Sequence, residues 1–235
     1  MLTHQLPVRV VTATRLTADE FHRNTYTGQS LNAHASISAF QLRLYPENIY
    51  GLSEVYNDAI DDAHSNPALL VFVHDDVFIL DFYWEQTIRY WLTQFEVVGI
   101  AGNRRRLPFS MMWSLVLDPI TGRLREEEKA FQSGAVAHGV FPPIQVNRFG
   151  VSGVECALLD GLLIAVDSRV LHRSGVRFDP QFKFHFYDMD FCRSAFQAGL
   201  KLGTMPLSVV HASAGGGDFK KWKDVSKLYL DKWGD

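Results

Sequence analysis

Two adjacent carboxylates follow a short apolar run in the first half of the chain. Asp75 and Asp76 come after the residues ALLVFV and one histidine, His74. Carboxylates held this close repel each other unless a cation or a proton lies between them. Oxygen ligands of this kind suit Mg²⁺ or Mn²⁺. The pattern therefore indicates a divalent-ion site, and an ordinary turn at a strand end explains the two residue types equally well.

A histidine occupies the matching position at the end of a second apolar run. His211 follows the residues LSVV and precedes ASAGGG. If both runs are strands that end at one edge of a sheet, His211 and Asp76 can share an ion. An imidazole ligand would favour Mn²⁺ over Mg²⁺. An isolated histidine is more often structural, so this prediction depends on how the strands are placed.

A third carboxylate, Asp188, stands at the start of a helical pattern, within the sequence YDMD. The positive end of a helix lowers the pKa of a carboxylate near it. Asp188 is therefore a candidate general base. Residue type alone favours ordinary capping of the helix.

The elements that position these residues alternate between helices and strands. We expect strands at 8–12, 68–73, 96–101, 162–166 and 207–211, and helices at 52–65, 82–93, 168–173 and 188–198. Ser53 is placed to cap the first of these helices, and Gly199 to end the last. The alternation predicts a layered α/β domain with a central, mostly parallel sheet flanked by helices. Ligands of such folds bind beyond the carboxyl ends of the strands.

The domain organisation follows from length and composition. The chain has 235 residues, 47% of them hydrophobic, and no linker-like segment divides it, so we expect a single domain over residues 1–235. Residues 102–150 break the alternation and form a long variable connection. Residues 212–235 are a possible lid and C-terminal tail, because three glycines precede Lys220, Lys221 and Trp222. A plain surface helix explains this tail equally well.

Charge and cysteine usage exclude several classes of protein. The net charge is -3 and the pI about 6.3, so the overall field favours neither nucleic acid nor an anionic membrane. Cys156 and Cys192 are too few for a disulfide framework or a zinc site. The N-terminus lacks the apolar region of a signal peptide, and no run is long enough for a membrane span. We expect a cytoplasmic protein, with peripheral membrane association left open.

Four segments of the chain resemble one enzyme family in order and approximate spacing. They are NIYGLSEVYN at 48–57, LVFVHDDV at 70–77, LDGLLIAV at 159–166 and FDPQFKFHFYDMDFCRSAFQAG at 178–199. With the histidine at 211, this set resembles the family 2 type glycosyltransferases with the GT-A fold, over about residues 8–215. No single motif is specific, but the ordered set is.

The resemblance implies roles for individual residues. Asp75 and Asp76 resemble the DxD motif, with Asp76 on the metal and Asp75 nearer the nucleotide ribose. Asp188 matches the catalytic base, although Tyr187 replaces the family's preceding glutamate. Residues implied to hold the donor are Asp160 and Gly161 beside the sugar, and Thr12, Thr14, Gly51, Tyr56 and Asn57 around the nucleotide.

The implied activity is metal-dependent transfer of a sugar from a nucleotide-diphospho-sugar to an acceptor hydroxyl, as in polysaccharide biosynthesis. The metal would be Mn²⁺ or Mg²⁺, held by Asp76 and His211. Attack assisted by Asp188 as base predicts inversion at the anomeric carbon. The acceptor is an unidentified glycan, lipid-linked compound or protein. Two alternatives stay open: a sugar nucleotidyltransferase, and a non-catalytic carbohydrate- or nucleotide-binding protein of the same fold.

Overall fold

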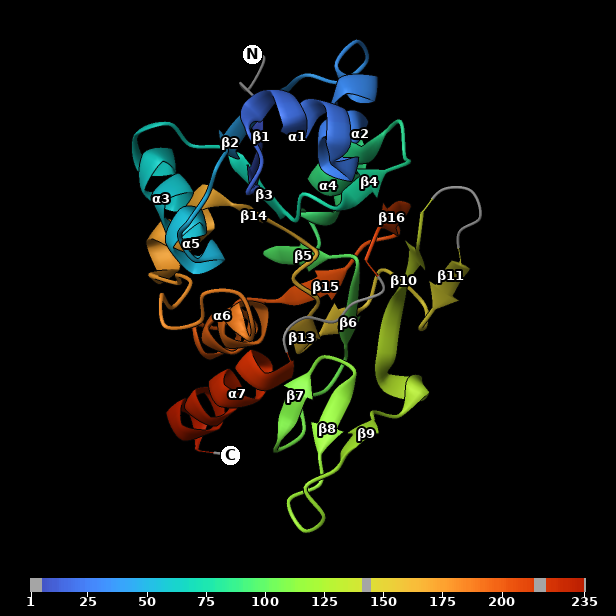
Figure 1. Cartoon of the computed structure of the whole chain (residues 1–235), viewed down its shortest axis with the longest axis vertical. Helices are drawn as coiled ribbons and strands as arrows, with labels where there is room; N and C mark the ends of the chain where they lie inside the picture. Colours follow the sequence, from blue (N-terminus) through green and yellow to red (C-terminus); the bar gives the residue numbers. More distant parts are fainter. Residues whose placement is uncertain (1–5, 141–144, 214–218, 235) are drawn as a thin grey trace.

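A seven-stranded mixed sheet forms the centre of the molecule. The computed structural model describes residues 6–140, 145–213 and 219–234 (Figure 1). The strands run in the order β12 (Glu155–Cys156), β15 (Leu202–Thr204), β5 (Val97–Gly99), β14 (Leu163–Asp167), β3 (Leu69–Val73), β1 (Val8–Ala13) and β2 (Phe40–Tyr45). The layered α/β fold expected from the sequence is confirmed.

The expectation of a mostly parallel sheet needs correction. β1 runs parallel to β2 and β3, but β14 runs antiparallel to both β3 and β5. A parallel return requires a crossover connection, usually a helix. The chain instead reaches β14 from β5 through two further sheets, and no α-helix lies between them in the described residues.

Seven helices are described around the sheets. They are α1 (Ala18–Asn24), α2 (Tyr26–His34), α3 (Leu52–Ser65), α4 (Trp84–Trp91), α5 (Ser168–Ser174), α6 (Tyr187–Gln197) and α7 (Phe219–Trp233). Figure 1 shows α3 beside α5, and α6 beside α7. None of these helices is both long and apolar enough to cross a membrane.

The helix expected at 52–65 is confirmed, but its cap is not Ser53. Gly51 is the N-cap, and its N–H donates to the Glu54 carboxylate over 2.9 Å. The Ser53 hydroxyl, two residues after the N-cap, donates to the Phe182 carbonyl at 2.6 Å. Ser53 therefore fixes the α3 N-terminus to the segment that leads into α6.

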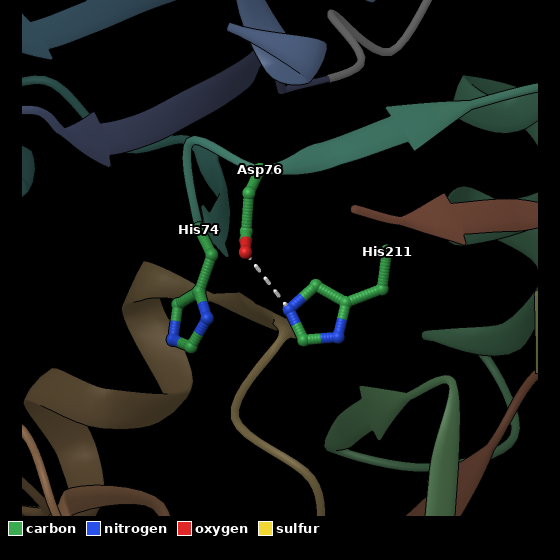
Figure 2. A group of neighbouring side chains, drawn as sticks. All are labelled: His74, Asp76 and His211. Carbon is green, nitrogen blue, oxygen red and sulfur yellow. Dashed lines mark ion pairs between the residues drawn. The ribbon is translucent and has the colours of Figure 1, made fainter. Parts of the chain in front are cut away.

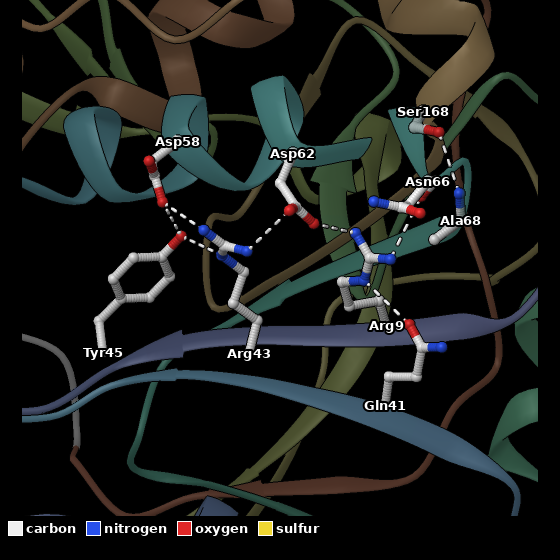
Figure 3. Close-up of polar contacts among 9 residues, drawn as sticks. All are labelled: Arg9, Gln41, Arg43, Tyr45, Asp58, Asp62, Asn66, Ala68 and Ser168. Atoms are coloured by element: carbon white, nitrogen blue, oxygen red, sulfur yellow. Dashed lines mark hydrogen bonds and ion pairs between the residues drawn. The ribbon is translucent and has the colours of Figure 1, made fainter. Parts of the chain in front are cut away.

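An ion-pair network fastens α3 to the outer strands (Figure 3). Arg9 on β1 reaches Asp62 at 2.8 Å, and Arg43 on β2 reaches Asp58 at 2.7 Å. The Tyr45 hydroxyl also donates to Asp58, at 2.6 Å. Most of these side chains are partly exposed, so each pair contributes little on its own and the network mainly fixes the helix in place.

The chain also forms a second, six-stranded sheet. Its order is β13 (Leu158–Leu159), β6 (Ala101–Asn103), β10 (Gln132–His138), β16 (Val209–His211) and β4 (Val77–Ile79), with β11 (Gln145–Arg148) paired to β10. The apolar run at 96–101 thus serves both sheets, because the chain changes sheet at Ile100.

Residues 102–150 contain regular structure that the sequence does not indicate. β6 and β10 pair antiparallel with Asn103 opposite Gln132, and between them a small third sheet projects from the molecule. Its strands are β7 (Ser110–Met112), β8 (Leu115–Leu117) and β9 (Leu124–Glu126), and a short 3₁₀ helix follows at Lys129–Phe131. We call this part, residues 104–131, the β7–β9 extension.

Ion pairs anchor the base of the β7–β9 extension. Arg105 pairs with Glu127 at 2.9 Å and with Glu128 at 2.8 Å, and its guanidinium lies 3.5 Å from the centre of the Phe131 ring. The side chain of Asn103 donates to the Trp113 carbonyl at 2.9 Å. These contacts hold the small sheet against the main body.

The C-terminal tail is the helix α7, which packs on α6. Lys232 bridges Asp190 at 2.6 Å and Asp179 at 2.8 Å, and Trp233 donates to Asp190 at 2.9 Å. Residues 214–218 of the expected lid lie outside the described residues. Trp222 belongs to the first turns of α7 and reaches the cavity described below.

Candidate active site

Three side chains from distant parts of the chain offer ligand atoms within 4.8 Å of one another. They are His74, Asp76 and His211 (Figure 2). His74 and Asp76 lie in the turn between β3 and β4, and His211 ends β16. Asp76 Oδ2 and His211 Nε2 are 3.2 Å apart. The predicted proximity of Asp76 and His211 is therefore present, and His74 joins them.

The reason for this proximity differs from the expected one. β3 and β16 belong to different sheets, so Asp76 and His211 do not meet as neighbouring parallel strand ends. β4 runs antiparallel to β16 with Val77 opposite His211. The residue that precedes β4 must then lie beside the residue that ends β16.

The Asp76–His211 pair is electrostatically favourable. Burial acts to raise the pKa of Asp76, but the hydrogen bond and charge of His211 outweigh it and hold this pKa at about 2. Burial acts to lower the pKa of His211, and Asp76 reverses this, so the net shift is upward. Burial lowers the pKa of His74, which keeps that imidazole neutral. One ionised carboxylate and one neutral imidazole are thus already in the state that binds a metal.

Tyr187 orients His74 through a short chain of hydrogen bonds. The Tyr187 hydroxyl donates to the Gly161 carbonyl at 2.8 Å, so it accepts from Nε2 of His74 at 2.7 Å. This network assigns the proton of His74 to Nε2 and leaves Nδ1 as a free acceptor. A partner that fixes the tautomer is typical of metal-bound histidine. Tyr187 therefore has a structural role at this position, because it fixes the ring of His74.

The donor set fits a divalent metal ion. Oδ1 of Asp76 is buried and has no hydrogen-bond partner among the described residues, as expected of an atom that awaits a ligand. Two imidazoles and one carboxylate suit a transition ion such as Mn²⁺ better than Mg²⁺, which prefers oxygen.

Asp188 lies in the first turn of α6, where two backbone groups hold its carboxylate. The N–H of Gly161 donates to Oδ2 at 3.0 Å and that of Met189 to Oδ1 at 2.9 Å. Burial, and then the charge of Asp160, raise the pKa of Asp188 to about 7. The expected lowering by the helix end is therefore wrong, since desolvation outweighs it. Phe186, not an acidic residue, is the N-cap of α6.

Gly161 allows the close approach that this arrangement needs. A Cβ at this position would overlap the Tyr187 hydroxyl and lie 2.9 Å from Cβ of Asp188. Asp160, the preceding residue, accepts from the indole N–H of Trp113 at 2.7 Å and from the N–H of Leu162 at 2.9 Å. The turn between β13 and β14 thus connects Asp188, Tyr187 and the β7–β9 extension.

The metal-ligand candidates and Asp188 line one cavity of about 440 Å³, together with Asp160 and Gly161. A larger cavity of about 1120 Å³ adjoins it, and Asp75 lines both. Thr14 and Gly51 line this second cavity, beside Arg15, Lys183 and Tyr50. The two cavities share apolar residues, Ala13, Leu52 and Phe184, as well as Asp75 and His185.

Three of the predicted nucleotide-contacting residues lie away from both cavities. The Thr12 side chain is fully buried in β1. The Tyr56 ring is also buried and packs 4.6 Å from the centre of the Phe72 ring. The Asn57 amide donates to and accepts from the backbone of Phe178, at 2.7 and 3.1 Å. These positions connect α3 to the core and to the chain before α6.

Sequence reasoning missed two residues of the site. No role is assigned to His74 from the sequence, although a histidine two positions before Asp76 is itself a ligand type. Trp113 lies in a segment without a recognisable pattern, and nothing in its sequence context indicates that it reaches Asp160.

Comparisons with known proteins support the fold alone. No protein-family model and no curated protein sequence matched the chain. A197 from STIV has a similar structure, with a TM-score of 0.50 and 9% identity over 88% of this chain and 86% of that one. GalNAc-T7, in a structure with UDP, GalNAc and Mn²⁺, has a TM-score of 0.53 and 14% identity over 99% of this chain. The match covers 50% of the GalNAc-T7 chain, so this chain spans about half its length.

Proposed function

We propose that this protein is a glycosyltransferase that moves a sugar from a nucleotide-diphospho-sugar to an acceptor hydroxyl. One observation carries the proposal: Asp188, with a pKa raised to about 7, lines the same cavity as His74, Asp76 and His211. A general base is most effective when its pKa lies near the working pH. The fold shared with GalNAc-T7 is consistent with this activity.

The two cavities suggest how the substrates lie. The larger one would take the nucleotide, with Arg15 and Lys183 near its phosphates and Asp75 near the ribose. The donor sugar would then extend past Asp75 into the smaller cavity, toward Asp160 and Gly161. His74, Asp76 and His211 line the smaller cavity beside Asp75, so the diphosphate would meet them where the donor enters that cavity.

The chain's own residues can perform the proton transfer. Asp188 would accept the proton of the acceptor hydroxyl while its oxygen bonds to the anomeric carbon and the bond to the diphosphate breaks. The N–H groups of Gly161 and Met189 hold the carboxylate in one orientation for this step. Mn²⁺ bound at the three ligands would supply charge neutralisation for the departing diphosphate. Direct displacement of this kind inverts the anomeric carbon.

A product assay tests the proposal and separates the alternatives. The full chain is incubated with Mn²⁺ and a panel of sugar nucleotides, and released nucleoside diphosphate is measured together with pyrophosphate. A glycosyltransferase releases nucleoside diphosphate, with slow release to water when no acceptor is present. In a parallel incubation with a sugar 1-phosphate and a nucleoside triphosphate, formation of pyrophosphate and sugar nucleotide would instead indicate a nucleotidyltransferase. Donor binding without any release would indicate a binding protein.

Matched variants assign the metal site. Asp76→Asn should weaken both donor binding and rate, because the ion contacts the diphosphate before reaction as well. Asp231→Asn is the control, since Asp231 is an exposed residue of α7. Equal Mn²⁺ affinity in Asp76→Asn and Asp231→Asn would refute the metal assignment.

A further inference from the structure

The β7–β9 extension supplies one wall of the smaller cavity, and this wall is apolar. Its five lining residues are Met111, Met112, Trp113, Leu115 and Leu124. Met112 keeps 39% of its surface exposed and Leu124 keeps 36%. Unlike the buried apolar residues of the core, these two side chains have surface left to cover.

The facing wall has the same character. Phe184, Phe186, Met189 and Trp222 line it, from the chain before α6 and from α6 and α7. The rings of Phe186 and Trp222 lie 5.4 Å apart, and Phe184 is 54% exposed. A molecule between the two walls would contact aliphatic and aromatic side chains on both sides.

The polar side chains that line the cavity come from outside the β7–β9 extension. They are Asp188, Asp160, Asp75, Tyr187, His185, Ser213 and the metal-ligand candidates. Within the wall from the β7–β9 extension, the only side-chain donor is the Trp113 indole N–H, and Asp160 already accepts from it at 2.7 Å. The wall therefore has no side-chain group left to pair with a ligand hydroxyl.

We infer that the acceptor is an alcohol whose reactive hydroxyl is carried by an alkyl or aryl body, not by a glycan. This inference rests on the proposed function, since it places the hydroxyl at Asp188 and the body between the two walls. A sugar acceptor carries several hydroxyls, and those facing the extension wall would lose their water without gaining a side-chain partner, which is unfavourable. An apolar body gains from the same burial.

Linear primary alcohols test this inference by direct binding. Ethanol, 1-butanol, 1-hexanol and 1-octanol are titrated calorimetrically into the full chain with Mn²⁺ present, and glucose and maltose serve as polar probes. Affinity should rise about fourfold for each added methylene group until the cavity is filled. Glucose and maltose should bind more weakly than 1-octanol by at least tenfold. Failure of 1-octanol to bind, or equal binding of maltose, would overturn the inference.

Variants locate the binding to the extension. Leu124→Asn and Met112→Gln should each weaken 1-octanol binding several-fold, and both side chains are exposed enough for the fold to tolerate the change. Ile120→Asn is the control, because Ile120 belongs to the same extension, is 93% exposed and does not line the cavity. An equal loss in Ile120→Asn and Leu124→Asn would contradict the location.

Turnover separates this inference from the proposed function. With a donor that the enzyme hydrolyses slowly, 1-octanol should accelerate release of nucleoside diphosphate, whereas maltose should not. Acceleration by dissolved 1-octanol alone indicates a soluble alcohol, and acceleration also by 1-hexadecanol in phosphatidylcholine vesicles indicates a lipid. If donor hydrolysis occurs but neither alcohol accelerates it, the acceptor assignment is wrong and the proposed function stands. If no donor is hydrolysed, the proposed function fails whatever the alcohols bind.

Discussion

The surroundings of Asp188 disfavour the charged form of its carboxyl group. Ionisation of this group should therefore lower the free energy of unfolding by a measurable amount. Burial and the charge of Asp160 raise its pKa from the ordinary 3.8 to about 7. Between these values the unfolded chain has lost a proton that the folded protein keeps. The free energy of unfolding is therefore highest below about pH 4 with respect to this group and falls as the pH rises through about 7.

The size of the effect follows from the two pKa values. One pKa unit corresponds to 1.36 kcal/mol, so the charged carboxylate lowers the free energy of unfolding by up to about 4 kcal/mol above pH 7. Asp188 is only partly buried, and water in the cavity reduces the effect below this limit. Asp188→Asn removes the ionisation altogether. The variant should be more stable than the wild type at about pH 8.5, by roughly 1–4 kcal/mol, and by less than half of that margin at pH 5.

The same substitution should abolish most activity. Asn keeps the shape of the side chain but cannot take the acceptor proton, so turnover should fall by about two to four orders of magnitude. Donor and Mn²⁺ affinity should change little. Urea unfolding at the two pH values and nucleoside diphosphate release measure both effects on one protein. A more stable and less active variant is typical of a functional residue that the fold tolerates at a cost.

Two results would refute the reasoning. A stability difference of the same size at both pH values would show that Asp188 ionises normally. Near-normal transfer by Asp188→Asn would mean that Asp188 serves only to accept hydrogen bonds from two backbone N–H groups. The base would then have to be sought at Asp160. Asp190 is the weaker substitute, because its side chain is fully buried, does not line the cavity and contacts Lys232 and Trp233 through Oδ1. Asp231→Asn should change neither stability nor rate.

Three further predictions follow from the geometry. Gly161→Ala should lower turnover about a hundredfold, because the added Cβ would displace Tyr187. The same overlap should lower the free energy of unfolding by about 1–3 kcal/mol. Steady-state kinetics measures the first effect and urea unfolding the second. The affinity of the wild type for Mn²⁺ should weaken as the pH falls through the raised pKa of His211, because a proton competes with the metal for the imidazole. The His211→Ala variant should bind Mn²⁺ at least tenfold more weakly, and its affinity should depend less on pH. Calorimetric titration measures both effects. Asp62→Ala should lower the free energy of unfolding by about 1–2 kcal/mol, because it leaves the buried Arg9 short of a partner, while donor turnover is unchanged.

The parts of the fold that sequence reasoning predicted are those whose pattern is local. The run ALLVFV is buried along β3, and the spacing of apolar residues at 52–65 matches α3. β2 was missed because its residues, Phe40–Tyr45, are mostly half-buried at a sheet edge and show no clear alternation. The run at 96–101 appeared as one strand, since nothing local indicates that its two halves belong to different sheets.

The site was partly predictable for the same reason. Asp76 and His211 each follow an apolar run, and this position is visible without knowledge of the partner strand. His74 depends on Tyr187, which lies 113 residues further along the chain and fixes its ring. The pKa of Asp188 depends on burial and on Asp160, so helix position alone gave the wrong direction.

The β7–β9 extension leaves and rejoins the body at one place, because Asn103 and Gln132 are partners in the β6–β10 ladder. Partner residues in antiparallel strands lie about 4.5–5.5 Å apart, which a two-residue hairpin turn can span. The extension could therefore be shortened, exchanged or transplanted with little entropic penalty and without altering α6, β16 or the turn between β3 and β4, which carry Asp188, His211 and Asp76. Under the proposals made above, the wall that binds the acceptor and the groups that act on it lie on separate segments of the chain, so an exchanged extension would bring a different acceptor to the same groups.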